Sequence, residues 1–312
     1  MILMGLELHH TPVMVPEVLE ALAVQPGGRY IDGTLGEGGH SKVILEASDP
    51  GGQVLGLDAD HEAIAVARTR LERYGESFLA VNTNFRNMRN AALDLNFIPV
   101  HGILLDLGLS SLQLDAEARG FSFRRPDPLD MRFSLEQRLT ASEIVNGYGQ
   151  GELADVIYQL GEEPLARRIA AAIVRARPVR TSSDLADVVA RAAGGGPRKR
   201  IHPATRTFQA IRIAVNDELG ALQETLEQAM TVLGHGGRLV VIAYQSLEDR
   251  IVKNFMRRES TDCVCPPETL VCACGHKATL RLVSRRVIKP SETEVASNPR
   301  SRSARLRVAE RI

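Results

Sequence analysis

Short apolar runs alternate with helix-like segments along much of this 312-residue chain. The segment 61–74, for example, places apolar residues at helical spacing between two such runs. A chain in which strands and helices alternate folds into a parallel sheet that is covered by helices on both faces. The sequence therefore predicts an α/β fold with a doubly wound, mostly parallel sheet, and we expect its strands at 29–32, 53–58, 78–82, 100–106 and 238–244.

The alternation stops after the fourth run, because no strand-like segment occurs between Asp106 and Arg238. Helical patterns fill this region instead, and Thr181 begins a group of capping residues before one of them. The patterns predict helices over 151–177 and 183–193. We therefore expect an inserted all-helical domain at 115–203, carried by a sheet domain that comprises 1–114 and 204–312.

A long helix is expected to return the chain to the sheet from residue 204. Its apolar stripe runs from Phe208 to Leu233 in three- and four-residue steps, so we assign the stripe to the core. The side chains on the other side of this helix, free to meet a ligand or solvent, are those of Arg206, Gln209, Arg212 and Asn216. Two late runs, 279–288 and 304–309, predict a terminal antiparallel pair of strands.

A glycine-rich segment follows the first strand-like run. Four of the nine residues from Asp32 to His40 are glycines, which let the backbone approach a bound cofactor where a Cβ would clash. Asp58 ends the second run, twenty positions after Gly38, where a carboxylate can accept hydrogen bonds from both ribose hydroxyls of an adenosine cofactor. Together these features predict a site for a nucleoside cofactor.

The charge and spacing of this loop decide which cofactor it suits. A dinucleotide needs its pyrophosphate at a helix N-terminus, yet Glu37 places a carboxylate within the loop. The dinucleotide pattern also fails, because the third glycine position, counted from Gly36, is occupied by Ser41. S-adenosylmethionine carries no phosphate and has cationic groups, so it is the cofactor we predict. The alternative is a nicotinamide-dependent oxidoreductase.

Two further candidates lie at the ends of strand-like runs. In open α/β sheets, ligands bind outside the carboxyl ends of the strands. Asp106 ends the fourth run, where it can hold the cofactor or accept a hydrogen bond from a substrate amine. Phe85 follows the third run, where its ring can lie beside adenine or pack in the core.

The composition and the apolar runs of the chain bear on where the protein is located in the cell. The chain is 44% hydrophobic with zero formal net charge, which suffices for an α/β core and a smaller second unit. No apolar run approaches the roughly 18 residues of a membrane span, and the first residues lack the basic region of a signal peptide. We expect a cytoplasmic protein with no membrane partner.

All four cysteines lie between Cys263 and Cys274, which argues against a disulfide framework. They form two Cys-x-Cys pairs, and His276 follows them, so a tetrahedral zinc site is conceivable. The spacing usual in zinc ribbons is Cys-x-x-Cys, and the shorter spacing is less diagnostic. The sequence alone therefore leads us to assign no metal ligands.

Basic residues are concentrated in two places. The segment 281–312 has nine Lys or Arg residues against three Glu, and 198–212 has five basic residues and no acidic one. Such local excesses suit a polyanionic partner or a solvated surface. The loop 120–133 mixes aromatic residues with arginines, so it either stacks an unpaired base or packs as an ordinary surface loop.

Several strings along nearly the whole chain are distinctive, among them Asp-Gly-Thr-Leu-Gly-Glu-Gly-Gly-His at 32–40 and Ser-Leu-Glu-Asp-Arg at 246–250. The full set occupies 10–14, 30–40, 102–111, 119–123, 128–132, 202–210, 246–250 and 298–302. In these strings the chain resembles the bacterial ribosomal RNA small subunit methyltransferase H family. The resemblance implies a class I S-adenosylmethionine-dependent methyltransferase with an inserted helical domain.

The resemblance also implies the substrate and the roles of individual residues. The reaction would be methylation of the exocyclic N4 amino group of a cytosine in the decoding region of 16S rRNA, with the small ribosomal subunit as partner. Gly38, Gly39 and His40 would contact S-adenosylmethionine through the loop. Asp58 would bind the ribose and Phe85 would pack near adenine, while Asp106 and Gln113 would close the site.

One departure from the family bears on the mechanism. The family often has a histidine before Ser-Leu-Glu-Asp-Arg, where this chain has Gln245. An amide cannot take up a proton near neutral pH as imidazole does, so we assign no general base. We expect direct in-line transfer, with Asp106 as the catalytic residue that orients the amine.

We expect RNA to dock on Arg206, Arg212, the cluster 198–200 and the basic C-terminal segment. A non-catalytic RNA-binding protein with a relic cofactor pocket is the other alternative.

Overall fold

The structure is a computed structural model and describes residues 11–115, 118–194, 202–266, 268–269 and 271–312. The chain divides into two compact units. The sheet unit comprises the described residues of Met1–Gly108 and Ala221–Ile312, and the helical unit comprises those of Leu109–Gly220.

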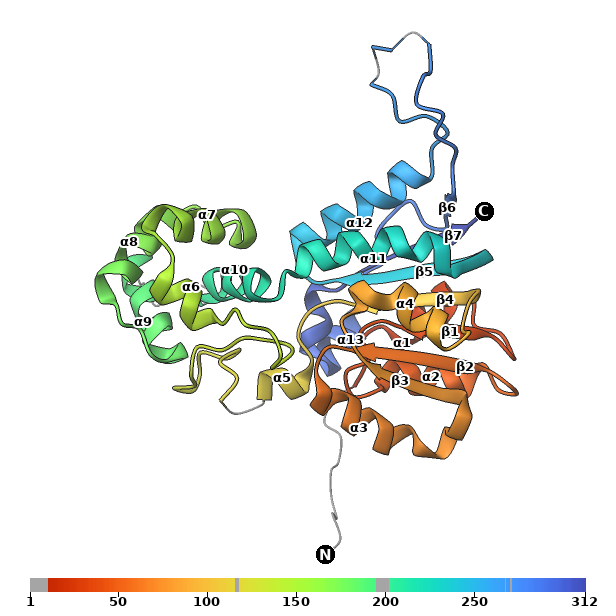
Figure 1. The fold of residues 1–312 in the computed structure, drawn as a ribbon, viewed down its shortest axis with the longest axis horizontal. Helices are drawn as coiled ribbons and strands as arrows, with labels where there is room; N and C mark the ends of the chain where they lie inside the picture. Colours follow the sequence, from red (N-terminus) through yellow and green to blue (C-terminus); the bar gives the residue numbers. More distant parts are fainter. Residues whose placement is uncertain (1–10, 116–117, 195–201, 267, 270) are drawn as a thin grey trace, which may run out of the picture. The chain divides into compact units, whose positions relative to one another are not determined.

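The sheet unit is built on a seven-stranded sheet with the order β3-β2-β1-β4-β5-β7-β6 (Figure 1). The strands β1 to β5 are parallel, and β7 runs antiparallel to both β5 and β6. All five predicted runs are strands, the terminal antiparallel pair forms, and the predicted fold class is confirmed. The strands are β1 Arg29–Asp32, β2 Gln53–Asp58, β3 Phe78–Asn82, β4 Val100–Asp106, β5 Leu233–Ala243, β6 Leu280–Leu282 and β7 Arg305–Arg311.

Helices cover both faces of this sheet. Successive side chains of a strand point to opposite faces, so each strand can pack against helices on both sides of the sheet. Leu105 of β4 packs in a core cluster with Leu226 of α11, whereas its neighbour Leu104 packs in another cluster with Ile44 of α2. The helices of the unit are α1 Val15–Leu22, α2 Gly39–Ala47, α3 His61–Leu71, α4 Met88–Asp94, α11 Glu218–Val232, α12 Ser246–Glu259 and α13 Glu292–Ser297, with the short 3-10 helices η1 Glu72–Ser77, η2 Phe85–Asn87 and η3 Pro299–Ser303.

The helical unit has a separate core. Its helices are α5 Ser111–Asp115, α6 Ala141–Gly147, α7 Gln150–Gly161, α8 Ala166–Ala176, α9 Ser182–Ala192 and α10 Thr205–Asn216. The unit extends beyond the expected 115–203, because Phe208, Ile211 and Val215 of α10 are buried in its core. In the described part of the chain, no helix has both the length and the apolar character that crossing a membrane requires.

Two predicted helices are each divided in the structure. The segment 151–177 forms α7 and α8, because Glu162 has a left-handed backbone with φ of 47° and Pro164 follows it. The long helix expected from 204 is interrupted in the same way at Asp217, whose φ is also 47°. Its continuous apolar stripe thus serves two cores, with Phe208 in one and Leu226 in the other.

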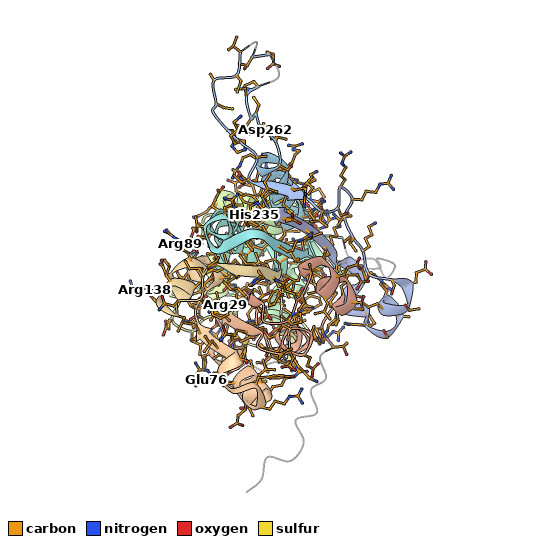
Figure 2. All side chains as sticks on the ribbon, turned by 90° about the vertical axis from the view of Figure 1, so that its right-hand side faces the viewer. Arg29, Glu76, Arg89, Arg138, His235 and Asp262 are labelled. Atoms are coloured by element: carbon orange, nitrogen blue, oxygen red, sulfur yellow. The ribbon has the colours of Figure 1, made fainter. Side chains whose placement is uncertain are left out.

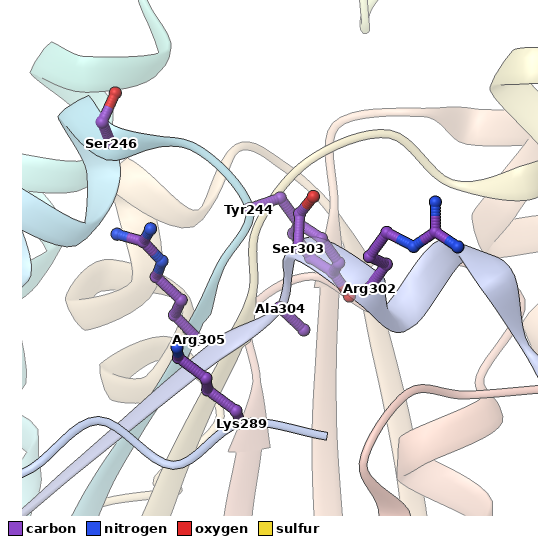
Figure 3. Close-up of a pocket in the computed structure, with 7 residues that line it drawn as sticks. All are labelled: Tyr244, Ser246, Lys289, Arg302, Ser303, Ala304 and Arg305. Carbon is purple, nitrogen blue, oxygen red and sulfur yellow. The ribbon is translucent and has the colours of Figure 1, made fainter. Parts of the chain in front are cut away.

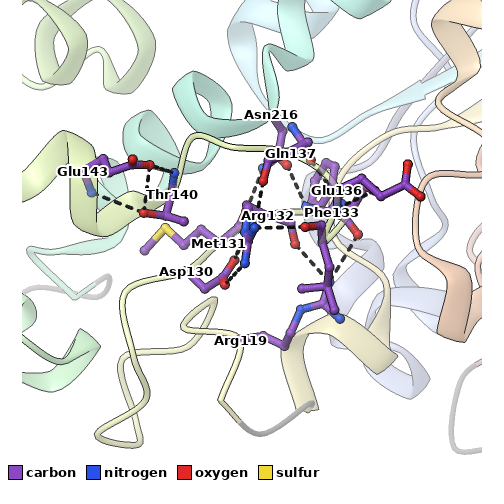
Figure 4. A network of polar contacts seen from close by, with 12 residues as sticks. Arg119, Asp130, Met131, Arg132, Phe133, Glu136, Gln137, Thr140, Glu143 and Asn216 are labelled. Atoms are coloured by element: carbon purple, nitrogen blue, oxygen red, sulfur yellow. Dashed lines mark hydrogen bonds and ion pairs between the residues drawn. The ribbon is translucent and has the colours of Figure 1, made fainter.

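Hydrogen bonds hold the loop 120–133 in place (Figure 4). The Arg132 guanidinium donates to both carboxylate oxygens of Asp130, at 2.9 and 2.8 Å. The side chain of Asn216 donates to the Met131 carbonyl at 2.8 Å and accepts from the Phe133 amide at 2.7 Å. These contacts favour the packed-loop interpretation. The prediction that Asn216 is free to meet a ligand is wrong, because its side chain is buried.

Candidate active site

The predicted glycine-rich loop connects β1 to the start of α2. Neighbouring strands fix its backbone: the Gly33 amide donates to a carbonyl of β4 and the Leu35 amide to a carbonyl of β2, each at 2.9 Å. Gly38 has a φ of +77°, and a Cβ there would lie 2.9 Å from the Leu71 side chain. The turn therefore requires glycine at this position.

Asp58, at the end of β2, binds this loop directly. Its Oδ2 accepts a hydrogen bond from the Gly36 amide and its Oδ1 accepts one from the Asp60 amide, both at 2.8 Å. Burial raises the pKa of the Asp58 carboxyl to about 6, although these two hydrogen bonds oppose the shift. A carboxylate oxygen has two lone pairs, so each oxygen can accept one more hydrogen bond, as the predicted ribose contact requires.

Phe85 lies beside the same loop. It begins η2, three positions after the end of β3, and its Cβ lies 3.5 Å from the point where a Cβ on Gly33 would stand. The ring is half-buried and packs against the core of the sheet unit. Both interpretations of Phe85 thus fit its position, and its contact with adenine stays a prediction.

Gln113 belongs to the helical unit. Its Oε1 accepts from the Ser110 amide at 3.2 Å, and the Ser110 Oγ accepts from the Gln113 amide at 3.1 Å. These two bonds fix the start of α5, and the Gln113 side chain is buried. The role of Gln113 toward the cofactor stays a prediction.

Asp106, the last residue of β4, is held on both sides of its carboxylate. Tyr244 donates its hydroxyl hydrogen to Oδ1 at 2.8 Å, and the Nδ1 of His40 lies 3.6 Å from Oδ2. The Asp106 amide donates to Thr34 Oγ1, in the glycine-rich loop, at 2.6 Å. Burial raises the pKa of Asp106, while His40 and Tyr244 oppose the shift. The side chain remains 16% exposed, so a ligand can reach it.

His40 is buried against this carboxylate. Its Nε2 lies 2.8 Å from the Val13 carbonyl oxygen, and a carbonyl only accepts, so Nε2 carries a hydrogen. The 3.6 Å separation from Asp106 is an ion-pair distance, and a cationic ring would attract the carboxylate. Asp32, also buried, accepts a hydrogen bond from Ser41 at 2.8 Å and interacts electrostatically with the same ring. The structure therefore places His40 as a neighbour of Asp106.

Tyr244 was not predicted as a site residue from the sequence. This residue follows β5 directly, at the carboxyl end of a strand that was predicted, and that position was the signal that could have found it. The next residue, Gln245, is the N-cap of α12, and both its amide nitrogen and its Nε2 donate to Glu248, at 3.3 and 2.8 Å. The amide that replaces the family's histidine thus takes part in capping a helix.

Tyr244 also lines a pocket with a volume of about 260 Å³ (Figure 3). The other lining residues come from α12 and from the basic C-terminal segment: Ser246, Lys289, Arg302, Ser303, Ala304 and Arg305. Arg305 forms an ion pair with Asp249 at 3.3 Å. Among the described residues, no carboxylate pairs with Lys289 or Arg302, so the pocket presents two cations beside Tyr244.

The other residues that we expected to dock RNA differ in their exposure and in their ion pairs. Arg212 is largely buried and donates to both carboxylate oxygens of Glu218, at 2.7 and 2.8 Å, so the prediction that it docks RNA is wrong. Arg206 is 55% exposed and lies 3.9 Å from the Glu163 carboxylate. The cluster 198–200 lies outside the described residues.

A sequence model of the MraW methylase family matches residues 7–312. The chain is 57% identical to the ribosomal RNA small subunit methyltransferase H of Dehalococcoides mccartyi over 307 residues, which cover 98% of this chain and 88% of that protein. It is 56% identical to the protein of the same name from Thermomicrobium roseum, with 97% and 94% of the two chains covered.

A solved structure, the SAM-dependent O-methyltransferase of Thermotoga maritima, is similar with a TM-score of 0.41 at 10% identity, over 96% of this chain and 64% of that one. The match of the family model to nearly the whole sequence, together with relatives that are more than half identical, shows that the chain belongs to the MraW methylase family.

Proposed function

We propose that this chain transfers a methyl group from S-adenosylmethionine to the N4 amino group of a cytosine in the decoding region of 16S rRNA. One observation carries the proposal: Asp106 presents a fixed, partly exposed carboxylate beside the glycine-rich loop. Membership of the methylase family and relatives named for small-subunit ribosomal RNA support the substrate class. The nicotinamide-dependent alternative finds no support in this family.

The cofactor is S-adenosylmethionine, as predicted, because a methylase with this class of sheet uses it as the methyl donor. When bound, S-adenosylmethionine supplies an electrophilic methyl group. The residues present fit it: Asp58 has acceptor positions for ribose, and Glu37 adds negative charge near a cationic ligand. The other members of the set are Gly38, Gly39, His40, Phe85, Asp106 and Gln113.

The chain acts on the amine by orientation. The lone pair of a cytosine amino group is delocalised into the ring, so the group is a weak nucleophile. A hydrogen bond from N4–H to an Asp106 oxygen fixes the amine and increases electron density on nitrogen as the new C–N bond forms. Tyr244 and His40 hold that carboxylate still. Orientation of this kind contributes roughly 7–11 kcal/mol in favourable cases, and the amine's proton leaves toward water past Asp106.

The target base must leave its stack to reach Asp106, as in other enzymes that modify a base. The Lys289 and Arg302 side chains stand in the pocket that Tyr244 lines, and Tyr244 contacts Asp106. Backbone phosphates of the RNA are the natural partners of these two cations. The inserted helical unit is our candidate for substrate recognition.

Mass spectrometry of 16S rRNA nucleosides tests the proposal. Ribosomal RNA or small subunits that lack the modification are incubated with S-adenosylmethionine and the chain, then digested. We expect N4-methylcytidine, and we expect Asp106→Ala to abolish it while binding of RNA and the far-ultraviolet circular dichroism spectrum persist. A methyl group on another atom, or near-normal activity of Asp106→Ala, would refute the assignment.

A further inference from the structure

The four cysteines of the chain converge in the segment 260–279, which joins α12 to β6 and extends from the sheet unit (Figure 1). The Sγ atoms of Cys263 and Cys272 lie 3.4 Å apart, those of Cys272 and Cys274 3.6 Å apart, and those of Cys274 and Cys263 3.9 Å apart. With Cys265, all four sulfurs lie within 4.8 Å of one another.

These separations match the edges of a metal tetrathiolate. Zinc–sulfur bonds are about 2.3 Å long, so four sulfurs at the corners of a tetrahedron lie about 3.8 Å apart. A disulfide requires a sulfur–sulfur distance of about 2.05 Å, and the cysteines are free thiols in this structure. The four sulfurs therefore lie at the spacing of ligands that share one metal ion, and they are not paired in disulfides.

The segment has no apolar core to hold this arrangement. None of its described residues is buried, and Val264 and Val271 are 43% and 78% exposed. Its two ends are joined, because the Thr279 amide donates to the Glu259 carbonyl at 2.8 Å and the Ala278 amide to Asp262 at 3.1 Å. Figure 2 shows Asp262 where the segment leaves the body of the sheet unit. These contacts hold only the two ends of the segment. Small structures that lack an apolar core are usually held by disulfides or metal ions.

The backbone of the segment also contacts one of the sulfurs, because the Val264 amide donates to Cys274 Sγ at 3.5 Å.

We propose that Cys263, Cys265, Cys272 and Cys274 bind one Zn²⁺ ion in a tetrahedral site that holds the segment 260–279 in its folded form. Four protein ligands leave no open coordination position, so the site is structural. His276, which the sequence offered as a ligand, is not one of the four: its Nε2 lies 3.0 Å from the Arg258 carbonyl oxygen. This site is independent of the methyl-transfer proposal.

Metal analysis of the full chain tests this site directly. The protein is purified with a phosphine reductant and without chelators, and its metal is measured by mass spectrometry; Co²⁺ then replaces the metal for visible spectroscopy. We expect one zinc per chain and the intense d–d and sulfur-to-cobalt bands of a tetrahedral tetrathiolate. A reduced chain that neither contains nor takes up Zn²⁺ or Co²⁺, or that forms disulfides instead, overturns the proposal.

Variants define the ligand set. We expect Cys263→Ser and Cys274→Ser to lose the ion to a competing chelator at a concentration that leaves the wild-type site filled. His276→Ala is the matched control and keeps the tetrathiolate spectrum. Loss of that spectrum in His276→Ala, or retention of the ion by both serine variants, contradicts the proposed donors. Circular dichroism of each variant verifies that the sheet unit is folded.

Proteolysis of the wild-type chain gives a measurement that needs no variant. Lys277 is exposed within the segment, so trypsin can cleave after it once the local structure opens. We expect a chelator to accelerate this cleavage and added Zn²⁺, but not Mg²⁺, to reverse the effect. Cleavage at the same rate with and without the chelator would show that no metal holds the segment.

Discussion

At the scale of single residues, the central feature of the candidate site is the Asp106 carboxylate, whose orientation is fixed by its neighbours. One oxygen accepts a hydrogen bond from Tyr244 and the other faces His40, while the backbone is tied to Thr34 of the glycine-rich loop. A side chain with partners on both oxygens cannot turn freely. The amine it accepts is therefore held in one orientation during transfer.

Replacement of Tyr244 by phenylalanine tests this positioning. The hydroxyl of Tyr244 lowers the pKa of Asp106 from the higher value that burial produces, so its removal raises that pKa further. Asp106 must be ionised to accept the amine hydrogen. As the solution is acidified, Tyr244→Phe should therefore lose activity at a higher pH than the wild type. Single-turnover methyl transfer measured against pH gives this midpoint. An unchanged profile, or a midpoint at lower pH, would show that Tyr244 does not act on Asp106.

The pKa of Asp58 makes cofactor binding sensitive to pH. Burial raises this pKa to about 6, so Asp58 loses its charge at a higher pH than an ordinary aspartate as the solution is acidified. Protonation removes an acceptor from the ribose contact, and S-adenosylmethionine should bind more weakly below pH 6, by at most about tenfold per pH unit. Calorimetric titration at several pH values measures this change.

Asp58→Asn is the control for this titration, because an amide does not titrate in this range. We expect the variant to bind more weakly than the wild type at pH 8 and to lose most of the dependence on pH near 6. Equal pH dependence in the variant and the wild type would assign the titration to another group.

At the scale of elements, the periodic patterns predicted the strands, whose positions depend on local sequence. The strands β1 to β4 were predicted at their observed bounds, since each is a short apolar run between polar turns. The interruptions at Glu162 and Asp217 were not predicted. In both cases the apolar pattern continues across the break, and near Asp217 the stripe divides between two cores, which periodicity along one helix cannot reveal.

The start of α9 provides a test at this scale. Thr181 was predicted as part of a cap, and the structure confirms a capping box: its Oγ1 accepts from the Asp184 amide and its amide donates to Asp184 Oδ2, both at 3.2 Å. Thr181→Ala should lower the free energy of unfolding by roughly 0.5–2 kcal/mol. Urea denaturation measures this loss. Thr181→Ser keeps the oxygen and should stay near the wild type, and equal losses in both variants would exclude the capping bond as the cause.

At the scale of the whole molecule, the net charge is zero, but one pocket is locally basic. Lys289 and Arg302 come from the C-terminal segment that the sequence analysis identified as basic. Composition alone could not separate a polyanion site from a solvated surface. The fold makes the distinction possible because it gathers these two cations beside Tyr244, whereas it commits Arg212 to an ion pair with Glu218.

RNA binding should therefore depend on the pocket. We expect Lys289→Gln with Arg302→Gln to weaken binding and to reduce the slope of log K against log salt by about 0.7 per lost charge. Arg89→Gln, which removes an exposed charge on α4, serves as the matched control and should leave the slope unchanged. Equal slopes for the wild type and the double variant would exclude Lys289 and Arg302 as phosphate contacts.

The candidate site was predictable from sequence where its residues lie at the ends of predicted strands. The glycine-rich loop follows β1, and Asp58 and Asp106 end β2 and β4, so their convergence follows from the rule for strand ends. The partners of Asp106 required the fold, because Tyr244 is 138 positions away in the chain. The buried position of His40 against Asp106 likewise depends on how α2 packs, which its neighbours in sequence do not specify.

A diffraction structure of the chain with S-adenosylhomocysteine and cytidine tests the central claim most directly. We expect the ribose hydroxyls of the cofactor product to contact the Asp58 carboxylate, and the cytosine amino group to contact Asp106 with its nitrogen facing the sulfur. A ribose bound away from Asp58, or a cytosine amino group that reaches the sulfur without touching Asp106, would contradict this account.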